Sequence, residues 1–305
     1  MAFDAFALML AMLALGMLFA RLRVLPDNAG ETLNLLVLYV CLPAAILLNV
    51  PKLRFDVSLL ALAALPWLIA AASWALVTLA SRWLKFRRDE TVVLVLLTML
   101  GNTSYVGFPM IEALLGGQAL PYAVVYDQFG TFLLLSTVGL LVLARGSGDS
   151  APSAKAIVRR ILLFPPTWAL AFGLTLMPEQ PPQWIALALE RLAGVLVMLV
   201  MLAVGLGIQL RLPRDEIAPL ATGLVLKLVL LPAVSLPLAW LLGMRGEVLQ
   251  VGVLETAMPP MITAAALAIA HGLAPRLAAT VVGYGIVLSL VTLPLWRVVL
   301  QHVSL

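Results

Sequence analysis

The sequence predicts an all-α membrane protein with ten transmembrane helices. Of its 305 residues, 63% are hydrophobic and only 11% are charged. A soluble domain needs many more charged residues to cover its surface. Apolar stretches of about 20 residues recur along the whole chain, and each is long enough to cross the hydrocarbon core of a bilayer. We therefore expect a polytopic integral membrane protein without a sizeable soluble domain.

Clusters of charged residues, proline and glycine separate the apolar stretches and divide the chain into ten expected spans. These spans are 3–20, 30–49, 57–81, 91–115, 121–144, 160–177, 187–208, 216–242, 248–271 and 276–300. The single cysteine, Cys41, lies inside the second span. No intrachain disulfide is therefore expected.

The distribution of Lys and Arg predicts the orientation of the spans. Thirteen of these residues lie in the connections after spans 1, 3, 5, 7 and 9, and five lie on the opposite side. Connections rich in Lys and Arg face the cytoplasm. The central loop is therefore predicted to be cytoplasmic and both termini periplasmic or extracellular, in a bacterial inner (plasma) membrane.

Internal similarity predicts two repeats of five helices. The segments 130–137 and 285–292 share Gly and Thr positions at an offset of 155 residues, and the same offset relates Gly117 to Gly272. Spans 3 and 8 each contain a proline followed eight residues later by a tryptophan. We expect a first repeat at 1–144, a cytoplasmic linker at 145–159 and a second repeat at 160–305. An odd number of spans per repeat gives the two repeats opposite orientations, as in many secondary transporters.

Spans 4 and 9 carry the strongest helix-breaking patterns. LGNTSYVGFPM (100–110) interrupts span 4, and Pro259 with Pro260 interrupts span 9. Each break begins about 16 Å into its span, at 1.5 Å per residue, which is close to the bilayer midplane. We expect both helices to break and cross there, so that the following half-helices offer their N-termini to an anion. The alternative is a pair of unrelated proline kinks.

Particular residues are expected to produce these breaks. The proline pair is predicted to end one half-helix and to form the first turn of the next. In span 4, Thr103 or Ser104 is expected to cap the second half-helix. The predicted break residues are Gly101, Gly107, Pro109, Pro259 and Pro260.

Three charged residues lie within predicted spans. Lys227 lies near the middle of span 8, where an ammonium group costs at least about 2.5 kcal/mol unless it faces the bundle interior or water. It can act as a counter-ion for the substrate, as a fixed positive charge in place of a cation, or as a proton carrier. Glu255 is a candidate for coupling or gating, or else forms a salt bridge with Lys227 or Arg191, or is hydrated. Asp127 is a third coupling candidate, or is merely hydrated near the outer face.

The residues around the two breaks are the candidates for substrate binding. Asn102 and Tyr105 can hydrogen-bond a carboxylate directly. The full set is Asn102, Thr103, Ser104, Tyr105, Met258, Pro259, Pro260 and Thr263. No nucleotide-binding, zinc or nucleophile motif is present, so no enzyme activity, cofactor, metal or nucleic-acid partner is expected. An aspartyl protease using Asp127 and Asp149 is disfavoured, because Asp149 lies in the polar central loop.

Four segments resemble one known family. GNTSYVGFP (101–109) and ETAMPPMITAAALA (255–268) resemble the fourth- and ninth-helix motifs of bacterial auxin efflux carrier family permeases. AVGLGIQL (203–210) and LAATVVGYGIVLSLVTLPLW (277–296) are also similar to this family. The resemblance implies two inverted five-helix repeats, with broken helices 4 and 9 crossing. It also implies a scaffold domain and a crossover domain, each assembled from both repeats, often in a homodimer.

The resemblance implies a secondary transporter that carries a small organic anion, a mono- or dicarboxylate, across the bilayer by elevator-like alternating access. Two positions depart from the family: Gly101 replaces a proline of the plant carriers, and Thr263 replaces an asparagine. The substrate of the plant carriers is therefore not transferred to this chain. The bile acid–sodium symporters share the implied fold, so coupling to H⁺ or Na⁺ and a sodium-coupled anion symporter stay open. A channel or receptor on the same fold is a further alternative.

Overall fold

The computed structural model describes residues 2–53, 56–208 and 214–303. The described residues form helices and connections and contain no β-strand. Six of these helices are long and apolar enough to cross a membrane, or seven if one bent pair counts as a single span. The chain is thus an all-helical integral membrane protein, as the sequence predicts. The arrangement as ten spans in inverted repeats stays a prediction.

The chain forms two compact units, and each of them draws on both halves of the sequence. Unit 1 comprises Met1–Phe55, Ser104–Val124 and Arg159–Ile208. Unit 2 comprises Asp56–Thr103, Val125–Val158 and Gln209–Leu305. Each unit is described below by itself.

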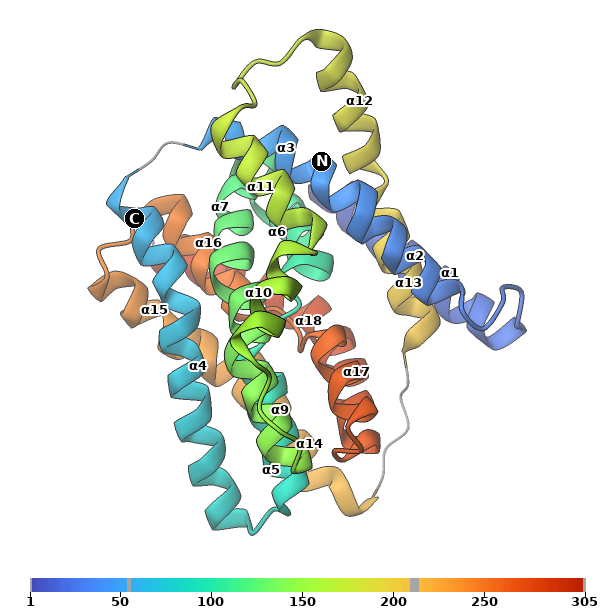
Figure 1. Cartoon of the computed structure of the whole chain (residues 1–305), viewed down its shortest axis with the longest axis vertical. Helices are drawn as coiled ribbons and strands as arrows, with labels where there is room; N and C mark the ends of the chain where they lie inside the picture. Colours follow the sequence, from blue (N-terminus) through green and yellow to red (C-terminus); the bar gives the residue numbers. More distant parts are fainter. Residues whose placement is uncertain (1, 54–55, 209–213, 304–305) are drawn as a thin grey trace. The chain divides into compact units, whose positions relative to one another are not determined.

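Unit 1 is built around the packing of its first helix against its last. Its elements are α1 (Ala2–Leu22), α2 (Ala29–Leu36), η1 (Val37–Cys41), α3 (Leu42–Asn49), η2 (Val50–Lys52), most of η3 (Thr103–Gly107), α6 (Phe108–Leu115), η4 (Gly117–Ala119), α7 (Leu120–Val125), α11 (Pro165–Thr175), α12 (Gln183–Gly194) and α13 (Leu196–Gly207). Figure 1 shows α1 and α13 side by side. A Cβ added at Gly16 of α1 would lie 2.9 Å from the Cα of Gly205 in α13. The two glycines therefore allow the backbones to approach closely, as small residues do in membrane helix pairs.

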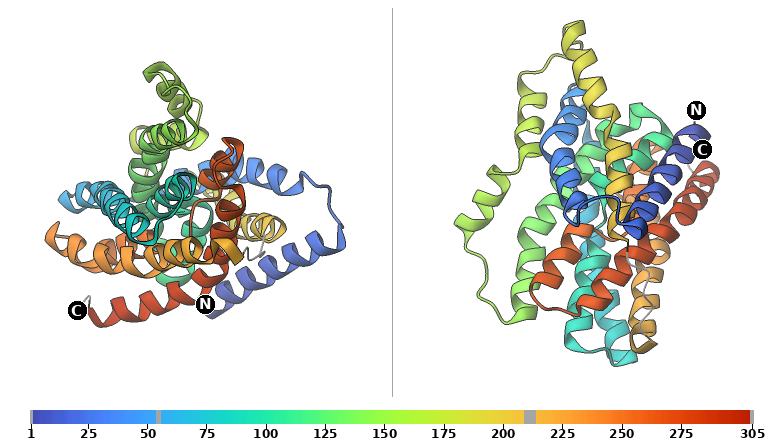
Figure 2. Two further views of the ribbon diagram at one scale, coloured as in Figure 1. Left: turned by 90° about the horizontal axis from the view of Figure 1, so that it is seen from below. Right: turned by 90° about the vertical axis from the view of Figure 1, so that its right-hand side faces the viewer.

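Unit 2 contains the longest helices. Its elements are α4 (Val57–Leu84), α5 (Arg88–Met99), η5 (Tyr126–Thr131), α8 (Phe132–Leu134), η6 (Leu135–Gly139), α9 (Leu140–Ser147), the first part of α10 (Ala154–Leu162), η7 (Arg214–Glu216), α14 (Ile217–Val225), η8 (Leu226–Leu230), α15 (Leu231–Leu241), α16 (Gly246–Thr256), α17 (Ile262–Ala270) and α18 (Pro275–Val303). The carboxylate of Asp56 caps α4 by accepting a hydrogen bond of 2.7 Å from the Ser58 N–H. The Ser58 hydroxyl donates to the same carboxylate oxygen, and this bond, together with the one from the N–H, lowers the pKa of Asp56. Lys85 ends α4 in the left-handed conformation. The chain then returns through α5, which lies beside α4 (Figures 1 and 2).

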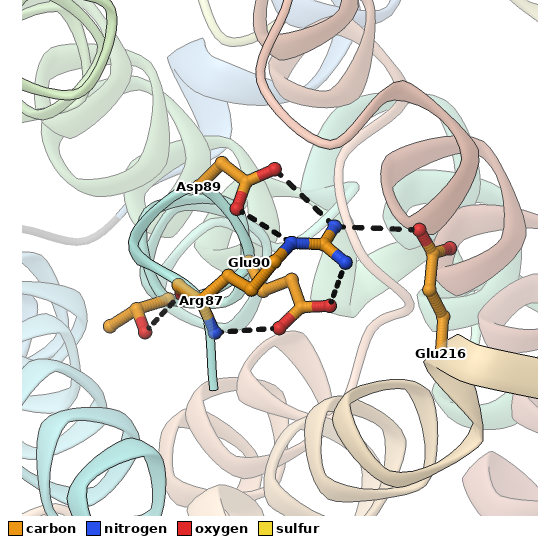
Figure 3. A network of polar contacts seen from close by, with 5 residues as sticks. Arg87, Asp89, Glu90 and Glu216 are labelled. Carbon is orange, nitrogen blue, oxygen red and sulfur yellow. Dashed lines mark hydrogen bonds and ion pairs between the residues drawn. The ribbon is translucent and has the colours of Figure 1, made fainter. Parts of the chain in front are cut away.

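A cluster of charges joins the start of α5 to the start of α14 in unit 2. Figure 3 shows the Arg87 guanidinium between the carboxylates of Asp89, Glu90 and Glu216. Its nitrogen atoms lie 3.2 Å from both Asp89 and Glu90 and 3.8 Å from Glu216. The Glu90 side chain also accepts the Arg87 backbone N–H at 2.8 Å. Glu90 thus accepts from both the backbone and the side chain of Arg87, which fixes the first turn of α5.

The predicted span 6 is divided in the structure. It begins earlier than expected, with α10 inside the predicted linker 145–159, and α10 is bent by 65° relative to α11 (Figure 2). Pro165 and Pro166 occupy the first turn of α11, where a missing N–H costs nothing. The predicted linker therefore contains the end of α9 and much of α10, and only the residues between these helices are irregular.

Candidate functional site

Two helices of unit 2 end where the sequence predicts breaks. Helix α5 stops at Met99, and Leu100 takes an extended conformation with φ −106° and ψ 112°. Helix α16 stops at Thr256, and the chain stays unwound until Ile262 begins α17. The predicted breaks at Gly101 and at the proline pair are therefore present.

The two unwound segments are hydrogen-bonded to each other. The N–H of Asn102 donates to the carbonyl of Pro259 at 2.8 Å, and the N–H of Met261 donates to the carbonyl of Leu100 at 3.1 Å. These bonds form an isolated antiparallel bridge between Gly101 and Pro260. Freed backbone groups cost several kcal/mol within a bilayer, and here four of them satisfy one another. We call this pairing of residues 100–102 with 259–261 the crossing.

Three details of the predicted breaks are wrong. Gly107 precedes α6 in helical conformation, and Pro109 is the second residue of α6, so neither interrupts the chain. Pro259 and Pro260 lie in the unwound segment rather than in the first turn of α17. A proline has no N–H to donate, and this costs nothing here because the bridge uses the carbonyl of Pro259 and the N–H of Met261. Thr103 begins the π-helical turn η3, and its hydroxyl bonds a side chain of another helix instead of capping.

Lys227 lies beside the crossing and bonds the end of α16. It is 2% exposed, within the π-helical turn η8, and its Nζ donates to the carbonyl of Thr256 at 3.1 Å. This carbonyl is one that the end of α16 leaves free, and a positive charge there favourably opposes the helix dipole. A Cβ at Gly101 would lie 3.2 Å from this Nζ and 3.3 Å from the Glu255 carbonyl oxygen. Glycine at position 101 therefore makes room for the ammonium group.

Span 5 contributes a second group of polar side chains. Asp127, in η5, is buried, and its carboxylate accepts hydrogen bonds from Thr103 Oγ1 at 2.5 Å and from Gln128 Nε2 at 2.7 Å. The expectation that Asp127 is merely hydrated near the outer face is therefore wrong. The Tyr126 hydroxyl lies 3.0 Å from Thr256 Oγ1. Because Thr256 Oγ1 donates its own proton to the Gly252 carbonyl, Tyr126 must be the donor.

Two buried polar groups at the crossing have no hydrogen-bond partner among the described residues. They are the amide nitrogen Nδ2 of Asn102 and both carboxylate oxygens of Glu255. Asn102 is 1% exposed and Glu255 is fully buried. Leaving such groups unpaired costs about 1–3 kcal/mol each. These groups therefore have no hydrogen bond to lose on meeting another polar group.

The charge of Glu255 interacts with those of Lys227 and Asp127. In the part of the chain that the structure describes, no cation forms a salt bridge with Glu255. The salt bridge considered for Glu255 from the sequence is therefore absent from this part. One ammonium group faces two carboxylates in this cluster, so the cluster carries a net charge of −1 when all three groups are ionised.

The remaining candidates have different surroundings. Met258, Pro259 and Pro260 are buried within the crossing segment. Ser104 and Tyr105 are half-buried in η3, and Thr263 is exposed near the start of α17. Sequence analysis missed Thr256, Tyr126 and Gln128 as partners. The only signal for them in the sequence is that Thr256 follows Glu255 and that Tyr126 and Gln128 flank Asp127.

A separate cavity of about 570 Å³ lies within unit 1. Residues from α3, η2, α6, η4, α7, α12 and α13 line it. Its polar lining is Asn49, Lys52, Glu112, Gln118, Tyr122 and Glu190. In the predicted topology these positions lie at the outer ends of their spans.

Apolar helices that break at matched positions, with buried charges beside the breaks, are typical of membrane transport proteins. Comparison with known proteins agrees with this class. The sequence model of one family, described as Membrane transport protein, matches residues 1–297. The chain therefore belongs to this family, which is the auxin efflux carrier family that its motifs resemble.

Two archaeal relatives match over almost their whole length. An uncharacterized transporter of Methanothermobacter thermautotrophicus is 31% identical over 296 residues, covering 95% of this chain and 96% of the relative. An uncharacterized transporter of Methanocaldococcus jannaschii is 25% identical over 313 residues, covering 98% and 99%. Both names agree with a transport function.

Proposed function

We propose that the protein carries a small organic anion, a mono- or dicarboxylate, by elevator-like alternating access. The observation that carries this proposal is the unpaired amide nitrogen of Asn102. Asn102 follows Gly101, and the ammonium group of Lys227 lies close to Gly101. An amide N–H and an ammonium group are suitable donors to a carboxylate. The N-terminus of α17, which begins directly after the crossing, adds a partial positive charge.

We propose further that protons accompany the substrate. An anion entering a cluster with one ammonium and two carboxylates meets net repulsion. A proton on Glu255 removes one negative charge and breaks no hydrogen bond, because its oxygens have no partner. Sodium coupling and uniport driven by the membrane potential are the alternatives.

The proposal includes the arrangement in the membrane. The chain would form ten spans as inverted repeats 1–144 and 160–305, in the plasma membrane, as a homodimer. The central loop would be cytoplasmic, and the cavity of unit 1 would be the outer vestibule. The thirteen-to-five bias of Lys and Arg supports this orientation.

Flux into proteoliposomes tests the proposal. A panel of mono- and dicarboxylates would be measured while pH, Na⁺ and membrane potential are varied one at a time. We expect saturable, trans-stimulated uptake of at least one carboxylate, faster with an inward proton gradient. Asn102→Ala should reduce this uptake at least tenfold, whereas Asn34→Ala on α2 should leave it unchanged.

Several outcomes contradict parts of this proposal. Uptake unchanged in both Asn102→Ala and Lys227→Ala would exclude the crossing as the site. Flux without saturation or trans-stimulation would indicate a channel, and binding without flux would indicate a receptor. Uptake that depends on Na⁺ and not on pH would mean that sodium, rather than a proton, is the coupled ion.

A further inference from the structure

Helix α10 (Ala154–Leu162) separates its charged and apolar residues onto two faces. At 100° per residue, Ile157, Val158, Ile161 and Leu162 fall within one arc, and Lys155, Arg159 and Arg160 fall within the opposite one. No residue of α10 is buried. An amphipathic helix of this kind normally packs its apolar face against something.

The three basic residues of α10 have no acidic partner in the described part of the chain. Arg87, in contrast, faces three carboxylates in unit 2. The charges of α10 are thus left for a negatively charged group outside the protein.

The junction of α10 with α11 shows that the apolar face of α10 adjoins other exposed apolar side chains. The 65° bend turns α10 away from the apolar helix α11. The indole Nε1–H of Trp168, in the first turns of α11, donates to the carbonyl of Leu162 at 2.6 Å and so fixes the bend. Trp168, Leu162 and Leu163 are exposed there, 60%, 49% and 64% respectively. Tryptophan is enriched at the level of the lipid headgroups.

We propose that α10 lies in the cytoplasmic headgroup region and binds the phosphate groups of anionic phospholipids. Its apolar face would enter the acyl boundary, continuous with Leu163 and Trp168. Its basic face would meet the headgroups, which attract each nearby Lys or Arg by about 1 kcal/mol. The occupant is a membrane rather than a protein, because the apolar face adjoins a helix apolar enough to belong to a membrane span. This site is independent of the transported substrate.

Hydrogen exchange of the full chain in lipid nanodiscs tests this proposal. The probes are nanodiscs of phosphatidylcholine alone and nanodiscs containing 30% phosphatidylglycerol. A helix of nine residues is marginal in water, so its amides exchange quickly unless it is docked. With three basic residues, we expect protection of residues 154–162 to be roughly a hundredfold higher with the anionic lipid. High salt should reduce this difference.

Three variants separate the charge of α10 from other effects. K155Q/R159Q/R160Q should lose the lipid-dependent protection, and K155R/R159K/R160K should keep it. R21Q/R82Q/K85Q removes three exposed basic residues on the same predicted side and should also keep it. Equal protection in both kinds of nanodisc would overturn the proposal. So would protection that survives K155Q/R159Q/R160Q, or that R21Q/R82Q/K85Q abolishes.

Discussion

At Gly101 the lack of a side chain determines which groups meet at the crossing. A Cβ there would be crowded by the Lys227 ammonium and by the Glu255 carbonyl oxygen. The Lys227 side chain would have to move, and its bond to the Thr256 carbonyl would lengthen or break. Glycine at position 101 of span 4 thus leaves room for the bond between Lys227 of span 8 and Thr256 of span 9.

Gly101→Ala should therefore destabilise the protein. Overpacking of this kind costs about 1–3 kcal/mol. We expect a lower midpoint of thermal unfolding in detergent micelles and slower carboxylate flux. Gly117→Ala is the control, because a Cβ at Gly117 meets no atom within 4 Å. Equal midpoints for the two variants would show that the close approach at Gly101 has no energetic importance.

The charges of Lys227 and Glu255 should depend on each other. Among the described residues they form no salt bridge, but removing one of two interacting buried charges leaves the other without its opposite charge, whereas replacing both leaves neither. Lys227→Met should be strongly destabilising, and adding Glu255→Gln should recover part of the loss. Unfolding midpoints of the two single variants and the double variant form the required cycle. Additive effects would mean that the two charges are not coupled.

The sequence could predict which of these residues are buried but not which groups they contact. Lys227 and Glu255 are buried, as their places within apolar spans indicate. The bond from Tyr126 to Thr256 joins residues 130 positions apart. Such contacts depend on how three helices pack, and no local pattern encodes them.

Among the elements, the unwound part of span 9 is held by α18 as well as by span 4. A Cβ at Gly285 of α18 would lie 2.5 Å from the Pro260 ring. Gly130 in η5 leaves similar room for the ring of Pro66 in α4, where a Cβ would lie 2.1 Å from Cγ. Two glycines that the repeat analysis paired thus each accommodate a proline ring.

Gly285→Ala should displace Pro260 and weaken the bridge at the crossing. We expect a loss of about 1–3 kcal/mol from overpacking. The midpoint of thermal unfolding should fall, and the Met261 amide should exchange its hydrogen faster. Gly207→Ala in α13 should do neither, because its Cβ meets nothing within 4 Å. Unchanged exchange at Met261 would contradict the proposed contact between α18 and the break.

The start of α14 should make stability depend on pH. Glu216 lies just before the candidate membrane span Ile217–Leu241, and its Oε2 is buried without a hydrogen-bond partner in the described residues. Burial raises the pKa of Glu216; Asp215 and Glu90 add to this rise, while Arg87 and Arg276 oppose it. The folded protein therefore keeps a proton that the unfolded chain releases. The stabilisation of the folded protein by this proton is fully present below the ordinary pKa of a glutamate. It is lost as pH rises through the raised pKa of Glu216.

Glu216→Gln tests this dependence. As pH falls through the raised pKa of Glu216 towards the ordinary pKa of a glutamate, the unfolding midpoint of the wild type should rise relative to that of the variant. Glu179→Gln, in an exposed connection, should behave like the wild type. Parallel pH profiles for wild type and Glu216→Gln would mean that Glu216 does not titrate differently in the folded state.

The sequence predicted the elements better than their ends. Hydropathy predicted the six or seven spans that the described residues contain, because an apolar stretch of about 20 residues has few alternatives in a bilayer. It misplaced the role of Pro109, since proline in the first turn of a helix and proline within a break look alike in sequence. The bend before α11 is not predicted, because residues 154–159 are assigned to the polar linker and span 6 begins only at residue 160.

For the whole molecule, two compact units are interleaved along the chain. Each takes segments from before and after the central loop, so neither is a continuous stretch of sequence. Composition alone cannot reveal this, because it does not say which segments pack together. The repeats 1–144 and 160–305 divide the chain differently from the compact units. They therefore stay a prediction.

The orientation of the whole chain can be tested with single cysteines. Cys41→Ala removes the only cysteine, and Ser150→Cys and Gln180→Cys then introduce one on each predicted side. Both positions are exposed, in the central loop and in the connection before α12. In intact cells, a membrane-impermeant maleimide should label Cys at 180 and should label Cys at 150 only after permeabilisation. The opposite pattern would reverse the predicted topology, and with it the assignment of the unit 1 cavity to the outer face and of α10 to the cytoplasmic leaflet.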